Sequence, residues 1–171
     1  MFKIGDMIIY SVHGMCEVED IVERTHRDVT RKYYVLHPLQ DPQLTIYSPD
    51  DNDKVIMLKP LEKDEAEVIL QSFENPGVPW IKDVKQRNRK YQQLIKNGDR
   101  KEIADIANTL MRKEFEHKER SKKLYDQDQK LLNRIQGILF KELSMTLDTS
   151  YENIIKKVED LIKASESTIV K

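Results

Sequence analysis

The spacing of apolar residues changes near residue 60, and this change divides the chain into two kinds of structure. Before that point, five short runs rich in β-branched and aromatic residues predict strands. The runs are Met7 to Tyr10, Met15 to Glu23, Lys32 to Leu36, Gln43 to Tyr47, and Val55 to Leu58. Turn-forming residues separate them, and no stretch between them is long enough for a crossover helix. Residues 1–60 therefore predict a small five-stranded antiparallel barrel.

After Pro60 the apolar residues recur at helical spacing. A helix is predicted over residues 63–73, and the breaker run from Asn75 to Pro79 predicts a linker after it. Further helices are predicted from Trp80 to Asn97, from Asp99 to His117, from Leu124 to Met145, and beyond Thr149. The fold class is thus α+β in two domains, a barrel over 1–60 and an all-α helical bundle over 80–171. Residues 61–79 form a helix and linker between them.

Residues typical of helix ends mark several of these boundaries. Gly98 is expected to end the helix that begins near Trp80, because glycine adopts the left-handed conformation without strain. Asp99 with Glu102, and Thr149 with Glu152, have the spacing of capping boxes. The helix after Thr149 carries an apolar stripe, and we interpret it as an added packing helix.

The charge is unevenly distributed although the net charge is only −1. Residues 1–72 carry −6, and the remainder carries +5. Residues 82–101 hold eight basic residues, opposed only by Asp83 and Asp99. Such a basic helix predicts an anionic partner, since ordinary surface helices interleave glutamate with lysine. A solvated helix face without a partner is the alternative.

Trp80, the only tryptophan, stands between the breaker run and this basic stretch. Two interpretations of its large apolar ring remain open at this point. The ring fills the seam between the two domains, or it is held out for a partner that offers stacking surface beside negative charge. Nucleic acid is a partner of that kind.

No pattern typical of catalysis or metal binding is present. The four histidines lie in different predicted elements, and there is no zinc-ligand spacing, phosphate loop or nucleophile elbow. Asp50, Asp51 and Asp53 lack the downstream glutamate of a calcium loop, so a solvated turn is the better interpretation. We therefore expect no enzymatic activity, no metal and no cofactor.

The composition also bounds the setting in which the protein works. A single cysteine, Cys16, excludes an internal disulfide and favours a reducing cytoplasm. No window approaches the ~20 apolar residues of a membrane span, and no signal peptide is recognisable. We expect a soluble, cytoplasmic, monomeric protein.

Three segments together resemble the CarD/CdnL family of bacterial transcription regulators. They are FKIGDMIIYSVHGMCEVEDI (2–21), QRNRKYQQLIKNGD followed by EIADIANTLMRKE (86–99 and 102–114), and KLLNRIQGILFKELS (130–144). The order and spacing of these segments carry the resemblance, which covers about residues 2–145.

The resemblance implies a division of labour between the two domains. The first would be a Tudor-like barrel that docks on the RNA polymerase β subunit through a strand edge, with contacts at Arg24 and Tyr47. The second would lie on promoter double-stranded DNA at the upstream edge of the transcription bubble, largely independently of sequence, and stabilise the open complex. Its contacts would be Trp80, Lys85, Arg87, Arg89 and Lys90, which would place the protein on the nucleoid.

The sequence departs from the family pattern at the tryptophan. Counted back from Gly98 and Asp99 without gaps, the family's tryptophan position falls on Val84. Trp80 is then one predicted helical turn away, a rise of ~5–6 Å, on nearly the same face. The alternative function is a protein–protein adaptor that binds polymerase or another partner without touching DNA.

Overall fold

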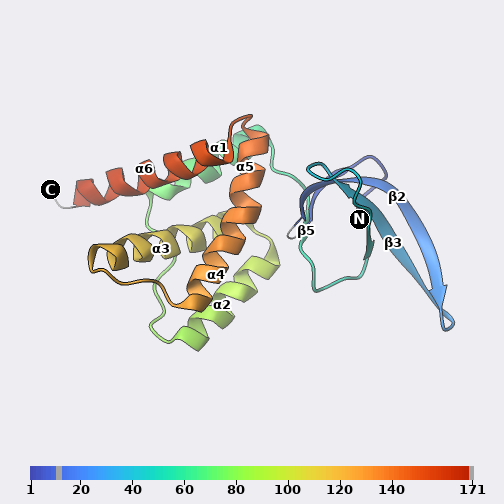
Figure 1. Cartoon of the computed structure of the whole chain (residues 1–171), viewed down its shortest axis with the longest axis horizontal. Helices are drawn as coiled ribbons and strands as arrows, with labels where there is room; N and C mark the ends of the chain where they lie inside the picture. Colours follow the sequence, from blue (N-terminus) through green and yellow to red (C-terminus); the bar gives the residue numbers. More distant parts are fainter. Residues whose placement is uncertain (11–12, 170–171) are drawn as a thin grey trace. The chain divides into compact units, whose positions relative to one another are not determined.

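The computed structural model describes residues 1–10 and 13–169 and divides the chain into two compact units, Met1–Pro60 and the part from Leu61 onward (Figure 1). Residues 11, 12, 170 and 171 lie outside the described residues. Of the segment 2–21, the structure therefore describes residues 2–10 and 13–21, and of the predicted domain 80–171 it describes residues 80–169. Each unit is described by itself.

The first unit is an antiparallel sheet whose strands occur in the order β4-β3-β2-β1-β5. The strands are β1 (Met7–Tyr10), β2 (Gly14–His26), β3 (Val29–Pro38), β4 (Ile46–Pro49) and β5 (Met57–Leu58). One face packs a small core that includes Ile8, Cys16 and Leu36. No ladder joins β4 to β5 among the described residues, so closure into a barrel is not confirmed. A two-residue β5 offers few groups for such a ladder.

Strands β2 and β3 extend beyond the predicted runs and form a long curved hairpin (Figure 1). The turn lies at Arg27 and Asp28, whose φ angles of 46° and 62° suit a two-residue hairpin. The Thr25 and Thr30 hydroxyls lie 2.8 Å apart across the two strands near the tip. The apolar alternation ends before the tip, and the sequence pattern therefore underestimates both strands.

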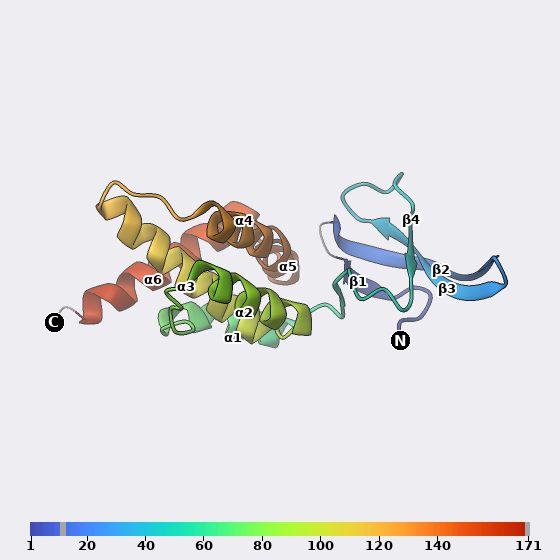
Figure 2. The same cartoon turned by 90° about the horizontal axis from the view of Figure 1, so that it is seen from below.

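The second unit contains only helices among its described residues (Figure 2). They are α1 (Lys63–Gln71), the 3₁₀ turn η2 (Ser72–Glu74), α2 (Val84–Asn97), α3 (Arg100–Glu119), α4 (Asp126–Ile135), the π-helical η3 (Gln136–Phe140), α5 (Lys141–Thr146) and α6 (Tyr151–Ile169). The run from α4 to α5 is continuous, as predicted for 124–145, with a π-turn inside it. Phe73 and Phe140 are fully buried and meet edge to face at 5.8 Å.

Two of the predicted helix ends are confirmed, and one is shifted. Gly98 ends α2 with a φ of 77°, and the Asp99 carboxylate accepts hydrogen bonds from the Lys101 and Glu102 N–H groups. Before α6, however, the Ser150 hydroxyl accepts from the Asn153 N–H at 3.1 Å. The predicted cap at Thr149 is therefore wrong by one residue. Helix α6 packs on the rest of the unit through Ile154, Val158 and Ile162.

The predicted linker at 75–79 is fixed to α3 and is not free. The Asn108 amide donates to the Asn75 carbonyl at 2.7 Å, and the Thr109 hydroxyl donates to the Val78 carbonyl at 2.8 Å. Helix α1 also packs against α3, α5 and α6. Residues 61–79 are therefore part of the helical unit, and we call residues 75–79 the strap. The bonds from α3 that fix the strap link distant parts of the sequence, so breaker residues alone cannot reveal them.

Gly77 is where the strap lies closest to α3, and its substitution gives a first prediction. A Cβ atom at Gly77 would overlap the Thr109 hydroxyl and the Asp105 carbonyl and lie 2.8 Å from the Thr109 backbone nitrogen. We expect Gly77→Ala to lower the free energy of unfolding by about 1–3 kcal/mol in urea denaturation, as overpacking does. Gly137→Ala is the control, because nothing lies within 4 Å of its Cβ position. Equal stability of the two variants would contradict the close packing of the strap.

Candidate nucleic-acid interface

Trp80 lies half-buried between the strap and α2, inside the helical unit. The Arg87 guanidinium carbon is 4.0 Å from the centroid of its ring, and the Lys113 Nζ is 5.2 Å from it. Helix α2 begins at Val84, where the Asp83 carboxylate accepts from the Gln86 N–H at 2.8 Å. Trp80 is therefore not helical, and the prediction that it shares a helix face with Val84 is wrong. Helices α2 and α3 hold the ring instead.

Arg87 is buried, with an exposed fraction of 0%. Its Nε and Nη2 donate to the two oxygens of Asp128 at 2.9 and 2.5 Å, and its Nη1 donates to the Ile81 and Lys82 carbonyls at 2.6 and 3.3 Å. The prediction that Arg87 contacts DNA phosphate is therefore wrong for this structure, because internal acceptors occupy its donors. Arg87 instead fixes the backbone just after Trp80 and supports the indole by a cation–π contact.

Tyr91, one turn further along α2, also holds the backbone next to Trp80. Its side chain is 1% exposed, and its hydroxyl lies 3.2 Å from the Pro79 carbonyl, to which it donates. Burial raises the pKa of Tyr91 to about 12, so the phenol stays protonated and remains a donor. Two buried side chains of α2 thus hold the chain on both sides of Trp80.

The other predicted DNA contacts are exposed on α2. Lys85, Arg89 and Lys90 all face solvent, as do Lys82 and Lys96. Within the part of the chain that the structure describes, none of these five forms an ion pair. The neighbouring carboxylates bind other groups of the protein, since Asp83 and Asp99 cap helices and Asp128 pairs with Arg87. The surface formed by these five side chains, the basic face, keeps its positive charge uncompensated.

Arg24 and Tyr47, the predicted polymerase contacts, meet on one surface of the first unit. The Arg24 guanidinium carbon lies 4.2 Å from the Tyr47 ring centroid. Tyr47 is 46% exposed and belongs to β4, which lies beside β3 at the edge of the sheet. An exposed edge with an arginine stacked on an aromatic ring can take part in strand addition.

His37 links the sheet to the loop before β4, and it gives a pH prediction. Its Nε2 lies 2.5 Å from a Glu19 oxygen, and its Nδ1 lies 3.0 Å from the Leu44 carbonyl. The hydrogen bond to Glu19 raises the pKa of His37 above 6.5. The hydrogen bond between protonated His37 and Glu19 is thus fully formed below pH 6.5. It is lost as the pH rises through the raised pKa of His37.

An NMR titration of the His37 ring should show this dependence directly. In Glu19→Gln the pKa should fall toward 6.5, because the carboxylate that favours the protonated ring is gone. Glu17→Gln is the control, since Glu17 lies opposite His37 in the ladder without bonding to its ring. If His37 had the same pKa in both variants, Glu19 would not be the group that raises it.

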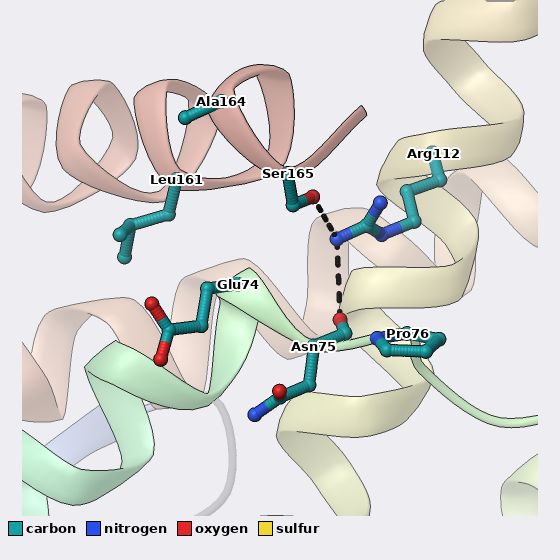
Figure 3. Close-up of a pocket in the computed structure, with 7 residues that line it drawn as sticks. All are labelled: Glu74, Asn75, Pro76, Arg112, Leu161, Ala164 and Ser165. Atoms are coloured by element: carbon teal, nitrogen blue, oxygen red, sulfur yellow. Dashed lines mark hydrogen bonds between the residues drawn. The ribbon is translucent and has the colours of Figure 1, made fainter. Parts of the chain in front are cut away.

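A pocket of about 490 Å³ lies between the strap and α6, and residues of the strap, α3 and α6 line it (Figure 3). Its cation, Arg112, donates to the Asn75 carbonyl at 3.1 Å and to the Ser165 hydroxyl at 2.8 Å. Burial lowers the pKa of Arg112, as expected for a guanidinium that serves internal contacts. The pocket therefore marks where α3 holds α6 and the strap together.

Two other features are absent from residues 1–10 and 13–169. No group of three or more histidine, cysteine, aspartate or glutamate side chains there is arranged to hold a metal ion. In the same residues, no helix has both the length and the apolar character needed to cross a membrane.

Comparison with known proteins assigns both units. Residues 2–60 match the CarD-like/TRCF RID domain, and residues 68–159 match the CarD C-terminal domain. The Bacillus subtilis (strain 168) protein named "Putative transcription factor YdeB" is 27% identical over 146 residues, which cover 85% of this chain and 92% of that protein. The chain thus belongs to the CarD family of transcription regulators.

Proposed function

We propose that the first unit binds the RNA polymerase β subunit, and that the helical unit binds promoter DNA at the upstream edge of the bubble and stabilises the open complex. One observation carries the DNA part of this proposal. Five exposed cations, which form no ion pair within the described residues, lie on α2 and just before it, next to a tryptophan that a buried guanidinium holds in place.

The basic face suits a duplex backbone. Lysine and arginine side chains that neutralise phosphates release counterions and bind without regard to sequence. Lys85, Arg89 and Lys90 can do this because their side chains are exposed and form no ion pair with the residues that the structure describes. Trp80 supplies apolar surface beside them, and an apolar wedge offsets an unstacking cost of a few kcal/mol per base step. Since Arg87 already orders the ring, less conformational entropy is lost on binding.

The first unit suits a protein partner. We propose that it is a Tudor-like domain of the polymerase-interacting type, with β4 as the docking edge. Backbone groups along the outer side of β4 would pair with a strand of the β subunit. The exposed Tyr47 ring, with Arg24 stacked on it, would make the side-chain contacts beside that ladder.

The two contacts would act together on open-complex formation. Docking on polymerase raises the local concentration of the basic face at the promoter. Tighter binding to the melted promoter than to the closed one then shifts the equilibrium toward the open complex, by as much as the two affinities differ. No catalytic step is required of this chain.

The lifetime of a promoter open complex, measured with and without the full chain, tests the proposal. We expect the wild-type chain to lengthen the lifetime and Trp80→Ala to lose most of the effect, while Trp80→Phe keeps part of it. Arg24→Glu should abolish capture of the β subunit and with it the effect on lifetime. A chain that captures polymerase but leaves DNA mobility and open-complex lifetime unchanged would be an adaptor and would refute the DNA part.

A further inference from the structure

We infer that Tyr125 is a second stacking residue of this interface, and that it binds an unpaired base of a melted DNA strand. This inference rests on the proposed function and adds a specific ligand chemistry to it. Duplex phosphates would bind the basic face, whereas the single strand beside the duplex would bind at Tyr125.

Tyr125 presents its ring to solvent from a fixed backbone. Its side chain is 60% exposed, and within the described residues it makes no hydrogen bond. The backbone is held because the Tyr125 carbonyl accepts from the Gln129 N–H at 3.0 Å and the preceding Leu124 is buried. Isolated exposed aromatic residues are common on protein surfaces. The surroundings of Tyr125 distinguish it from such residues.

The Tyr125 ring shares its surroundings with Trp80. The Arg87 guanidinium carbon lies 6.0 Å from the Tyr125 ring centroid and 4.0 Å from that of Trp80. Asp128, which holds this guanidinium, lies one turn after Tyr125 in α4. Both rings therefore lie next to the same buried guanidinium. The ion pair between α2 and α4 fixes its position.

The loop that leads to Tyr125 is basic and well held. From Arg120 to Tyr125 it contains Arg120, Lys122 and Lys123, all exposed, and no carboxylate. The His117 carbonyl accepts from the Lys122 N–H at 2.7 Å, and the His117 Nδ1 lies 3.1 Å from the Lys123 carbonyl oxygen. The loop therefore approaches the ring in a defined conformation with its charges directed to solvent.

Two acidic residues of α3 near this loop, Glu114 and Glu116, are already paired with lysines of α3. Glu116 lies 3.1 Å from Lys113, and Glu114 lies 3.7 Å from Lys118, so each is paired with a lysine of its own helix. Within the described residues, Lys122 and Lys123 form no ion pair. The loop thus adds positive charge next to an exposed aromatic ring.

An aromatic ring beside unpaired cations is the arrangement by which proteins bind single-stranded nucleic acid. Every base offers a π face, but in a duplex both faces are already stacked on neighbouring pairs. Only an unpaired base can stack on Tyr125, while Lys122 and Lys123 bind the adjoining phosphates. Asp126 is exposed next to the ring and opposes this binding, so Asp126→Asn should strengthen it.

Fluorescence anisotropy of two labelled DNAs tests the inference on the full chain. One DNA is a duplex, and the other is the same duplex with a short unpaired tail. We expect the wild-type chain to prefer the forked DNA. Tyr125→Ala should raise Kd for the forked DNA by roughly five-fold or more, the lower range for loss of one base–aromatic stack, with the duplex Kd changed less than about two-fold. Tyr125→Phe should keep the preference.

Val68→Ala is the control, since Val68 is an exposed apolar residue of α1 in the same unit and has no part in the proposed interface. The inference is overturned if Tyr125→Ala weakens both DNAs equally, or neither. Urea denaturation shows that the variant is folded, because an exposed ring without hydrogen bonds should contribute little to stability. Failure of the proposed function is distinguishable, since the wild-type chain would then bind neither DNA.

Discussion

Replacement of Arg87 by methionine is expected to lower the free energy of unfolding by about 3–5 kcal/mol. Arg87 and Asp128 are 0% and 2% exposed, so the substitution would leave a carboxylate in the interior without its cation. The Ile81 and Lys82 carbonyls would lose their donor at the same time. Urea denaturation followed by circular dichroism measures the change.

Two further variants separate this burial effect from a simple loss of charge. The double variant Arg87→Met with Asp128→Leu should recover most of the lost stability, since a buried ion pair can be replaced by apolar residues of similar volume. Arg89→Met removes a cation from the exposed face of the same helix and should change stability by less than about 0.5 kcal/mol. If Arg87→Met and Arg89→Met were equally stable, Arg87 and Asp128 would not form a buried ion pair.

Trp80 gives this experiment a spectroscopic readout as well. It is the only tryptophan, and the Arg87 guanidinium covers its ring at 4.0 Å. Loss of that cover should shift the emission of folded Arg87→Met toward longer wavelength. Arg87→Lys should not restore the wild-type spectrum, because an ammonium cannot make the two parallel bonds to Asp128 while stacking on the indole.

The sequence contains a signal for this pair that the charge pattern obscured. Arg87 occurs three residues after Val84 and four before Tyr91, which places it on the apolar stripe of α2. Asp128 stands likewise between Leu124 and Leu131 on the apolar side of α4. Opposite charges on two apolar stripes favour a buried pair. Which helices face one another depends on tertiary packing, which periodicity alone does not determine.

Because periodicity reports only local structure, some features of the fold could be predicted from the sequence and others could not. Periodicity and turn residues predicted the strands of the first unit and the helices after residue 60, because those signals are local. The start of α2 depends on the Asp83 cap, and the docking of the strap depends on Asn108 and Thr109 of α3. Barrel closure needs pairing between β4 and β5, the two outer strands of the sheet, and the two-residue β5 offers few groups for it. Tyr125 was missed because Arg87, its neighbour in space, lies in another helix.

Removal of three cations from the basic face should produce the largest change in DNA binding. We expect the variant with Lys85, Arg89 and Lys90 all replaced by alanine to bind duplex DNA with a smaller salt dependence. Each phosphate contact contributes ~0.9 to the slope of log affinity against log salt, so three contacts reduce it by about 2.7. Anisotropy titrations of duplex DNA at several salt concentrations measure this slope.

A matched triple variant decides whether position or only charge matters. Lys63, Lys156 and Lys157 are exposed on α1 and α6, and their replacement by alanine changes the net charge by the same amount. If α2 contacts the phosphates, this control should keep the wild-type slope. Equal slopes in the two triple variants would mean that binding follows only the overall charge, and α2 would then be an ordinary solvated helix. Because Arg87 is buried, adding Arg87→Ala to the first variant should reduce stability without reducing the slope further.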